Sequence, residues 1–391
     1  MKKLFFVWGN LGVGGISKSL VSLLRVLDGQ GYEIDLFLYS HSGVFMNELP
    51  ESVRLVNKSK FIYEVIGRTK DEIKQSKNPL KLICRLVFVL FCKIFGSQAF
   101  FDILLNFTPK FSGYDYAVSY SHDVDRKSLY AGYNQLVLKN VSAKRKITWV
   151  HCESGALAEI CDDVETGYQA FDRIVTISQT CKQTFCDMFP ALSDKVHVIF
   201  NFISEDYIRG LSCRGDMPKP RDAAVKLVTC ARMDKNKAVD RGVEAVVRLL
   251  SEGYDLSYTV IGDGPEYRSI KAIAERGGAG DRIRFDRTQG NPYCTVKASD
   301  LLIVPSITDA YPTVAEESMM LGTPVLGVEY AAAHEQLDGC GIVAENSTQG
   351  IYDALKTVLD NSEMLPGLKA GLAERAGNNQ KSLANLGELF E

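Results

Sequence analysis

Short apolar runs alternate with stretches of helical periodicity along most of this 391-residue chain. At the N-terminus, Leu4–Trp8 is followed by a glycine-rich loop and by leucines at helical spacing, and Glu33–Tyr39 is apolar again. A strand, a helix and a second strand in this order favour a parallel sheet with helices on its faces. We therefore expect an α/β fold.

The same alternation is clear again after the middle of the chain, which predicts two doubly wound domains that face each other across a cleft. A domain of this kind has about 100–200 residues, so the length allows two. We expect a domain over residues 1–203, a polar linker over 204–225, a second domain over 226–370 and a helix over 371–391 that can cross back to the first domain. The other expected strands are Tyr116–Tyr120, Lys146–Val150, Arg173–Ser178, Val196–Asn201, Lys226–Arg232, Ser257–Gly262, Ile283–Asp286, Leu301–Ser306, Pro324–Val328 and Gly341–Ala344.

The composition is that of an ordinary globular protein. Hydrophobic residues make up 46% of the chain, charged residues make up 24%, and the formal net charge is −3. These values exclude collagen-like and wholly disordered chains, and they give no reason to expect nucleic acid as a partner. The ten cysteines form no CxxC pair or zinc-site spacing. Because the first residues look like a strand and not like a signal peptide, we expect a reducing, cytoplasmic location.

Residues 60–110 differ in character and are expected to form an insertion in the first domain. Five basic residues and no acid lie between Ile73 and Gly96, and the seven apolar residues Leu86–Cys92 fall far short of the ~20 that span a bilayer. This pattern is typical of a basic amphipathic helix that lies on an anionic membrane surface. The alternative is a helix buried on one side, with its lysines in water.

The first glycine loop, residues 12–17, partly matches the dinucleotide motif G-x-G-x-x-G. Its third glycine is missing, and the second strand ends in Tyr39-Ser40, without an acid to bind a ribose. A nicotinamide dinucleotide is therefore disfavoured. A flexible loop at a helix N-terminus still suits a phosphate or a sugar, and the alternative is a tight turn for packing.

The most informative segment is residues 304–325, VPSITDAYPTVAEESMMLGTPV. A strand ends, a loop carries Asp309, and Pro312 stands at the expected first position of a helix. The free N–H groups of residues 313–315 would lie at the positive end of that helix, with Glu317 one turn beyond Thr313. The segment thus offers anion donors and two carboxylates. For Asp309 alone, a helix N-cap is an equally good interpretation.

This pattern resembles the retaining GT-B glycosyltransferases of family 4, whose motif is an acid, seven residues and a glutamate. Asp309 and Glu317 occupy its two ends, although the family usually has Glu-Gly-Phe or Glu-Gly-Tyr where this chain has Asp309-Ala310-Tyr311. The resemblance extends over nearly the whole chain and implies two Rossmann-like domains. Further similar segments are Cys230–Lys237 with Ala238 in place of glycine, Val260–Pro265, Asn291–Tyr293, the region of Glu335, Gly14-Gly15, Trp149–His151, Thr176–Ser178 and Asn201.

The resemblance implies an acceptor-binding N-terminal domain and a C-terminal domain that binds a nucleotide-diphosphate sugar, with a UDP-sugar as the expected donor. No metal or cofactor is expected, because Arg232, Lys237 and the helix amides would stabilise charge on the leaving diphosphate. Glu317 would accept bonds from ribose hydroxyls and Asp309 from sugar hydroxyls. The expected catalytic residues are Arg232, Lys237, Asp309 and His151. The expected donor-binding residues are Gly14, Gly15, Arg232, Lys237, Asp309, Pro312, Thr313, Val314 and Glu317.

Two further groups need separate interpretation. His151 follows an apolar strand, and the resemblance places it near the acceptor; as a general base it needs a pKa near the working pH, and otherwise it is a packed side chain. Asp123-Val124-Asp125 matches the Asp-x-Asp metal motif of GT-A glycosyltransferases. The double α/β architecture favours a solvated turn for these acids, and His122 beside them completes no ligand spacing.

The predicted function is that of a metal-independent, retaining hexosyltransferase. It would move a sugar from a nucleotide-diphosphate sugar to a saccharide or lipid-linked saccharide for capsule, exopolysaccharide or similar surface-polysaccharide biosynthesis. The segment 73–96 would hold it at the inner face of the cell membrane as a peripheral protein. The alternatives are a GT-B-like phosphorylase or nucleotide-sugar epimerase, and a catalytically weak scaffold or partner subunit.

Overall fold

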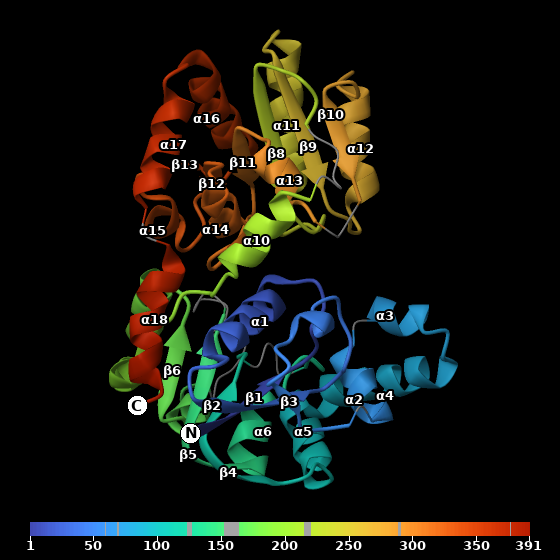
Figure 1. Cartoon of the computed structure of the whole chain (residues 1–391). Coiled ribbons are helices and arrows are strands. Elements are labelled where there is room, and N and C mark those ends of the chain that lie inside the picture. The colour runs from blue at the N-terminus through green and yellow to red at the C-terminus, as the bar shows by residue number, and fades with distance from the viewer. Residues whose placement is uncertain are drawn as a thin grey trace. The chain divides into compact units, whose positions relative to one another are not determined.

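The computed structural model describes the whole chain except residues 59, 69, 123–126, 152–163, 215–219, 288–290 and 376. The chain divides into two compact units, one formed by Met1–Ile203 with Asn378–Glu391 and the other by Ser204–Gly377. Each unit has a parallel sheet with helices packed on it (Figure 1). The prediction of two doubly wound, Rossmann-like α/β domains is confirmed. The Asp-x-Asp motif at 123–125 lies outside the described residues.

The first unit contains a seven-stranded parallel sheet in the order β3-β2-β1-β4-β5-β6-β7. The order reverses between β1 and β4, which are paired neighbours. Six of these strands were predicted; β3 has two residues, too few to show a period in the sequence. The strands are β1 (Lys2–Trp8), β2 (Tyr32–Leu38), β3 (Arg54–Leu55), β4 (Phe111–Ser119), β5 (Val141–Val150), β6 (Arg173–Thr176) and β7 (Val196–Val198).

The helices of the first unit include the predicted insertion, which forms the four helices α2 to α5. The last helix, α18, packs on this unit: Asn385 Nδ2 donates to the Val198 carbonyl at 2.9 Å, and Ser382 Oγ donates to the Phe200 carbonyl at 3.3 Å. The helices are α1 (Gly15–Leu27), α2 (Phe61–Gly67), α3 (Lys70–Gln75), α4 (Pro79–Phe95), α5 (Ser97–Asn106), α6 (Tyr133–Asn140), α8 (Val164–Gln169), α9 (Gln179–Met188) and α18 (Asn378–Leu389).

The second unit contains a six-stranded parallel sheet in the order β10-β9-β8-β11-β12-β13. All six strands were predicted. Three of them, Leu256–Ile261, Leu301–Val304 and Val325–Val328, are buried throughout, and strands of this kind read as apolar runs. The strands are β8 (Val225–Cys230), β9 (Leu256–Ile261), β10 (Ile283–Asp286), β11 (Leu301–Val304), β12 (Val325–Val328) and β13 (Gly341–Ala344). The helices are α10 (Glu205–Ser212), α11 (Val239–Ser251), α12 (Tyr267–Arg276), α13 (Tyr293–Lys297), α14 (Thr313–Met320), α15 (Ala333–Leu337), α16 (Thr348–Asp360) and α17 (Met364–Glu374).

The segment expected to be a polar linker begins with the helix α10, so that expectation is wrong for its first part. Ile208 is fully buried, and Asn291 Nδ2 donates to the Leu211 carbonyl at 2.7 Å. The helix therefore belongs to the second unit and packs near α13. Its eight residues are mostly polar, which hid its single buried face from the sequence analysis.

Candidate functional site

The candidate site of the second unit lies where the order of the sheet reverses. The strands β8 and β11 are adjacent, and the loops that follow their carboxyl ends are joined by hydrogen bonds. The Ile307 N–H donates to the Asn236 carbonyl at 2.8 Å, and Asn236 Nδ2 donates to the Thr308 carbonyl at 3.0 Å. In open α/β sheets, ligands bind at the carboxyl ends of the strands at such a reversal.

The two joined loops bring a cation and an acid together. Lys237 Nζ lies 2.5 Å from Asp309 Oδ2, and the two side chains are 33% and 16% exposed. The interpretation of Asp309 as an N-cap is wrong, because the N-cap of α14 is Pro312 and no side chain caps it. Pro312 thus precedes the first helical residue by one position. Asp309 is free of a capping role, and Lys237 orients its carboxylate.

A second acid, Asp234, organises the loop after β8. Its Oδ1 accepts the N–H groups of Asn236 and Lys237 at 3.0 Å each, and its Oδ2 lies 2.6 Å from Nε of Arg232. Burial opposes the charged form, yet these hydrogen bonds and the guanidinium hold the pKa of Asp234 below its ordinary value. The Arg232 side chain is 77% exposed and reaches outward from the same loop as Lys237. Asp234 was not predicted as a site residue, although its position between the two cations was the available signal.

The turn into α11 has a backbone conformation that favours glycine. Ala238 has φ 45° and ψ 41°, in the left-handed region, and is 2% exposed. A side chain with a Cβ atom adopts this region at a cost of about 1–2 kcal/mol. The conformation thus accounts for the glycine of the family pattern, and this chain keeps the turn with alanine.

The N-terminus of α14 differs in one donor from the expectation. Thr313 and Val314 stand in the first turn, where N–H groups have no intrahelical acceptor. The Ala315 N–H, expected to be free, donates to the Pro312 carbonyl at 3.1 Å. The buried Gln336 Nε2 donates to the same carbonyl at 3.1 Å and so fixes this turn. Two amides, those of Thr313 and Val314, therefore remain as the candidate anion donors at the positive end of the helix.

Glu317 is the buried acid of the site. Glu317 is 7% exposed. The hydroxyl of Tyr293, at the start of α13, donates to the Glu317 carboxylate. Burial and the neighbouring negative charge raise the pKa of Tyr293 far above its ordinary value. Tyr293 therefore remains a hydrogen-bond donor and fixes the carboxylate, which keeps further lone pairs for a ligand.

A buried network behind α14 was not foreseen. Glu316 Oε1 accepts from the Tyr311 hydroxyl at 3.0 Å and from Gln336 Nε2 at 3.2 Å. Arg375 binds the same carboxylate in a bidentate manner: Nη1 donates to Oε2 at 2.9 Å, and Nη2 donates to Oε1 at 2.7 Å. Two adjacent acids in one helical turn were visible in the sequence, but the partner 59 residues away was not. The network holds the loop that carries Asp309.

In the first unit, Gly14 and Gly15 stand at the start of α1, after the loop that follows β1. Gly14 is the N-cap of α1 and has an extended backbone, φ 169° and ψ 152°. A Cβ atom at Gly14 would meet nothing within 4 Å, whereas one at Gly43 would lie 2.0 Å from the Leu11 backbone. Packing therefore explains Gly43 but not Gly14, whose backbone is left open to an approaching ligand.

His151 follows β5 and is packed in the first unit. Its ring lies 4.8 Å from the Tyr120 ring, and the backbone N–H of His151 donates to Nδ1 of His122 at 3.3 Å. Among the described residues, neither ring nitrogen of His151 has a hydrogen-bond partner. Burial, with a smaller contribution from His122, lowers the pKa of His151 to about 3. That value does not meet the requirement for a general base near neutral pH.

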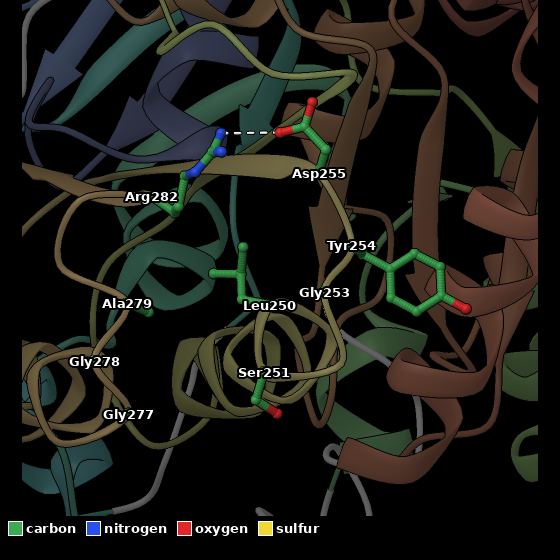
Figure 2. A pocket seen from close by; sticks show the side chains of 9 residues that line it. All are labelled: Leu250, Ser251, Gly253, Tyr254, Asp255, Gly277, Gly278, Ala279 and Arg282. Carbon is green, nitrogen blue, oxygen red and sulfur yellow. Dashed lines mark ion pairs between the residues drawn. The ribbon is translucent and has the colours of Figure 1, made fainter.

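A pocket at the other end of the second sheet lies away from these residues. The pocket in Figure 2 has a volume of about 510 Å³ and is lined by side chains at the amino ends of β9 and β10. Arg282 and Asp255 form an ion pair of 3.0 Å there (Figure 2). Because the loops with Lys237 and Asp309 are at the carboxyl ends, this pocket is not part of the candidate site. No group of three or more potential metal ligands occurs within the described part of the chain.

Comparison with known sequences gives a match to the second unit. Residues 224–361 match the family described as glycosyl transferases group 1. The lipopolysaccharide core biosynthesis glycosyltransferase LpsD of Rhizobium meliloti is 27% identical over 169 residues, which are 41% of this chain and 46% of that protein. A GDP-mannose-dependent phosphatidylinositol dimannoside mannosyltransferase of Mycobacterium tuberculosis is 26% identical over 143 residues, 36% of each chain. The chain thus spans less than half the length of these curated relatives.

Comparison with solved structures covers the whole chain. A glycosyltransferase from Rickettsia africae has a TM-score of 0.65 at 16% identity, over 100% of this chain and 97% of that one. HepE of Anabaena in complex with UDP has a TM-score of 0.64 at 13% identity, over 100% and 99%. At these identities the likeness establishes the two-domain GT-B fold. Together with the match of residues 224–361, it supports the glycosyltransferase family.

Proposed function

We propose that this protein transfers a sugar from a nucleotide-diphosphate sugar to a saccharide or lipid-linked saccharide acceptor of a surface polysaccharide. The observation that carries the proposal is the pair of joined loops after β8 and β11. They place Lys237 against Asp309 beside the start of α14, within the segment that matches the glycosyltransferase family. Relatives named for lipopolysaccharide core and colanic acid biosynthesis support the choice of acceptor.

The donor diphosphate fits the positive groups of this site. Cleavage of the sugar–diphosphate bond builds negative charge on the leaving phosphate, and fixed donors at that position lower the barrier. Lys237, Arg232 and the amides of Thr313 and Val314 would supply these donors without a metal ion. Asp234 holds the first two in one loop. A UDP-sugar is the proposed donor, supported by the UDP bound in HepE of Anabaena.

The acids would recognise the rest of the donor. Glu317, fixed by Tyr293, would accept bonds from ribose hydroxyls, and Asp309, fixed by Lys237, from hydroxyls of the transferred sugar. We propose retention by attack on the face from which the diphosphate leaves. The bond from the anomeric carbon to the phosphate oxygen breaks, the bond to the acceptor oxygen forms, and the diphosphate takes the acceptor proton. The low pKa of His151 supports the diphosphate as the proton acceptor.

The test uses the purified chain with radiolabelled UDP- and GDP-sugars, a membrane lipid extract and EDTA. We expect transfer of label from one donor in the presence of EDTA. Lys237→Met should lose it, whereas Lys271→Met, an exposed lysine of α12 that pairs with Glu275, should keep it.

Other outcomes would contradict the proposal. A requirement for free phosphate would indicate a phosphorylase, and isomerised donor without acceptor would indicate an epimerase. Donor binding without turnover, restored by a second protein, would indicate a partner subunit. Absence of both transfer and nucleotide binding would refute the donor site itself.

A further inference from the structure

Helix α4 presents an apolar surface to the outside of the first unit. Six of its residues are between 56% and 62% exposed, although all are large and aliphatic. At 100° per residue they fall within an arc of about 120°, which is one face of the helix. We call this the α4 surface, formed by Leu80, Ile83, Leu86, Val87, Leu90 and Ile94. A contiguous exposed apolar face of this kind marks an interaction site.

The opposite face of α4 is already used in packing. Cys92 is fully buried, and the buried Arg85 donates to the carbonyls of Val65 and Arg68 at 2.7 and 2.6 Å. Lys81 pairs with Glu64 of α2. Two of the five basic residues in the segment therefore hold α4 on the unit. The alternative of a helix buried on one side agrees with this packing, and the outer face is aliphatic.

The charges around the α4 surface favour an anionic occupant. Lys74, Lys77 and Lys93 are exposed, and no acidic residue occurs from residue 73 to residue 101. A second copy docked through the same surface would bring these lysines against one another, which is unfavourable. A lipid layer takes up apolar side chains and pairs anionic headgroups with lysines at the same time.

We propose that α4 lies in the plane of an anionic membrane surface, with the α4 surface in the acyl boundary and its flanking lysines at the headgroups. No described helix is long and apolar enough to cross a membrane. Helices α3 and α4 lie at the periphery of their unit, where such a surface can reach them (Figure 1). Membrane binding by α4 does not depend on the proposed function, which adds only that a lipid-linked acceptor would lie at the same membrane.

The test is co-sedimentation of the full chain with vesicles of phosphatidylcholine alone or mixed with phosphatidylglycerol. We expect binding to the mixed vesicles. The triple variant Ile83→Gln/Val87→Gln/Leu90→Gln should weaken it by about 100-fold or more, since each side chain loses apolar burial. Lys77→Gln/Lys93→Gln should reduce the preference for phosphatidylglycerol by about fivefold per lysine.

Val44→Gln, at an equally exposed aliphatic residue outside α4, is the matched control and should bind as the wild type. Circular dichroism and UDP binding show whether each variant is folded. The proposal is wrong if the wild type binds neither kind of vesicle, or if the triple variant binds as tightly as the wild type. A dimer in solution that the triple variant dissociates would assign the surface to a second copy. Vesicle binding without sugar transfer would refute the proposed function and leave this inference intact.

Discussion

Replacing Arg375 by methionine tests the buried network behind α14. In the folded chain, the side chains of Arg375 and Glu316 are 18% and 4% exposed and are joined by two hydrogen bonds. Burial alone would lower the pKa of Arg375, but the Glu316 carboxylate more than offsets this and raises it. The variant leaves a buried carboxylate with neutral donors only.

The size of the effect follows from that geometry. Removing one partner of a buried ion pair costs about 3–5 kcal/mol. Tyr311 and Gln336 still donate to Glu316, so we expect the lower end, about 3 kcal/mol. With a urea dependence of about 2 kcal/mol/M, the unfolding midpoint falls by roughly 1.5 M.

Urea unfolding followed by circular dichroism measures this shift. Both tryptophans, Trp8 and Trp149, are in the first unit, so their fluorescence reports that unit separately. Glu316→Leu/Arg375→Met should regain most of the loss, because an apolar pair leaves no buried charge. Arg209→Met, at a pair that is about half exposed, should change stability by less than about 0.5 kcal/mol. A loss below about 1 kcal/mol for Arg375→Met would refute the reasoning.

Four further predictions concern the site and the histidines. Glu317→Ala should weaken UDP binding by about 10-fold or more in calorimetry, since a buried acceptor is lost. Arg232→Ala and Lys237→Ala should each lower kcat by ~10²-fold in the transfer assay, and unchanged rates in folded protein would exclude their roles. Ala238→Gly should raise the free energy of unfolding by about 0.5–1 kcal/mol, because it relieves a left-handed alanine. Burial lowers the pKa of His122 from 6.5 to about 4. Between these values the unfolded chain binds a proton at His122 and the folded chain does not, so the free energy of unfolding falls as the pH drops from 6.5 to about 4. In His122→Asn the fall should be shallower, and an identical pH profile would contradict this.

The apolar runs and the order of motifs could be read without coordinates. Strands such as Leu301–Val304 and Val325–Val328 are visible because every residue in them is buried, on both faces of the sheet. The resemblance joined Lys237 to Asp309 in one site, and the two lie in contact. A strand of two residues and a polar helix, β3 and α10, leave too little periodicity to be found.

Contacts between distant positions were decided by the fold alone. The sequence marks residues 304–325 as a strand, a loop and a helix, but not that Glu316 faces Arg375 while Glu317 faces Tyr293. It likewise shows that α4 is apolar and basic, but not that Arg85 is buried and Leu90 exposed. Local patterns determine which elements form, because period and turn chemistry act over a few residues. Which face of an element is buried depends on neighbours far along the chain, and only tertiary packing supplies them.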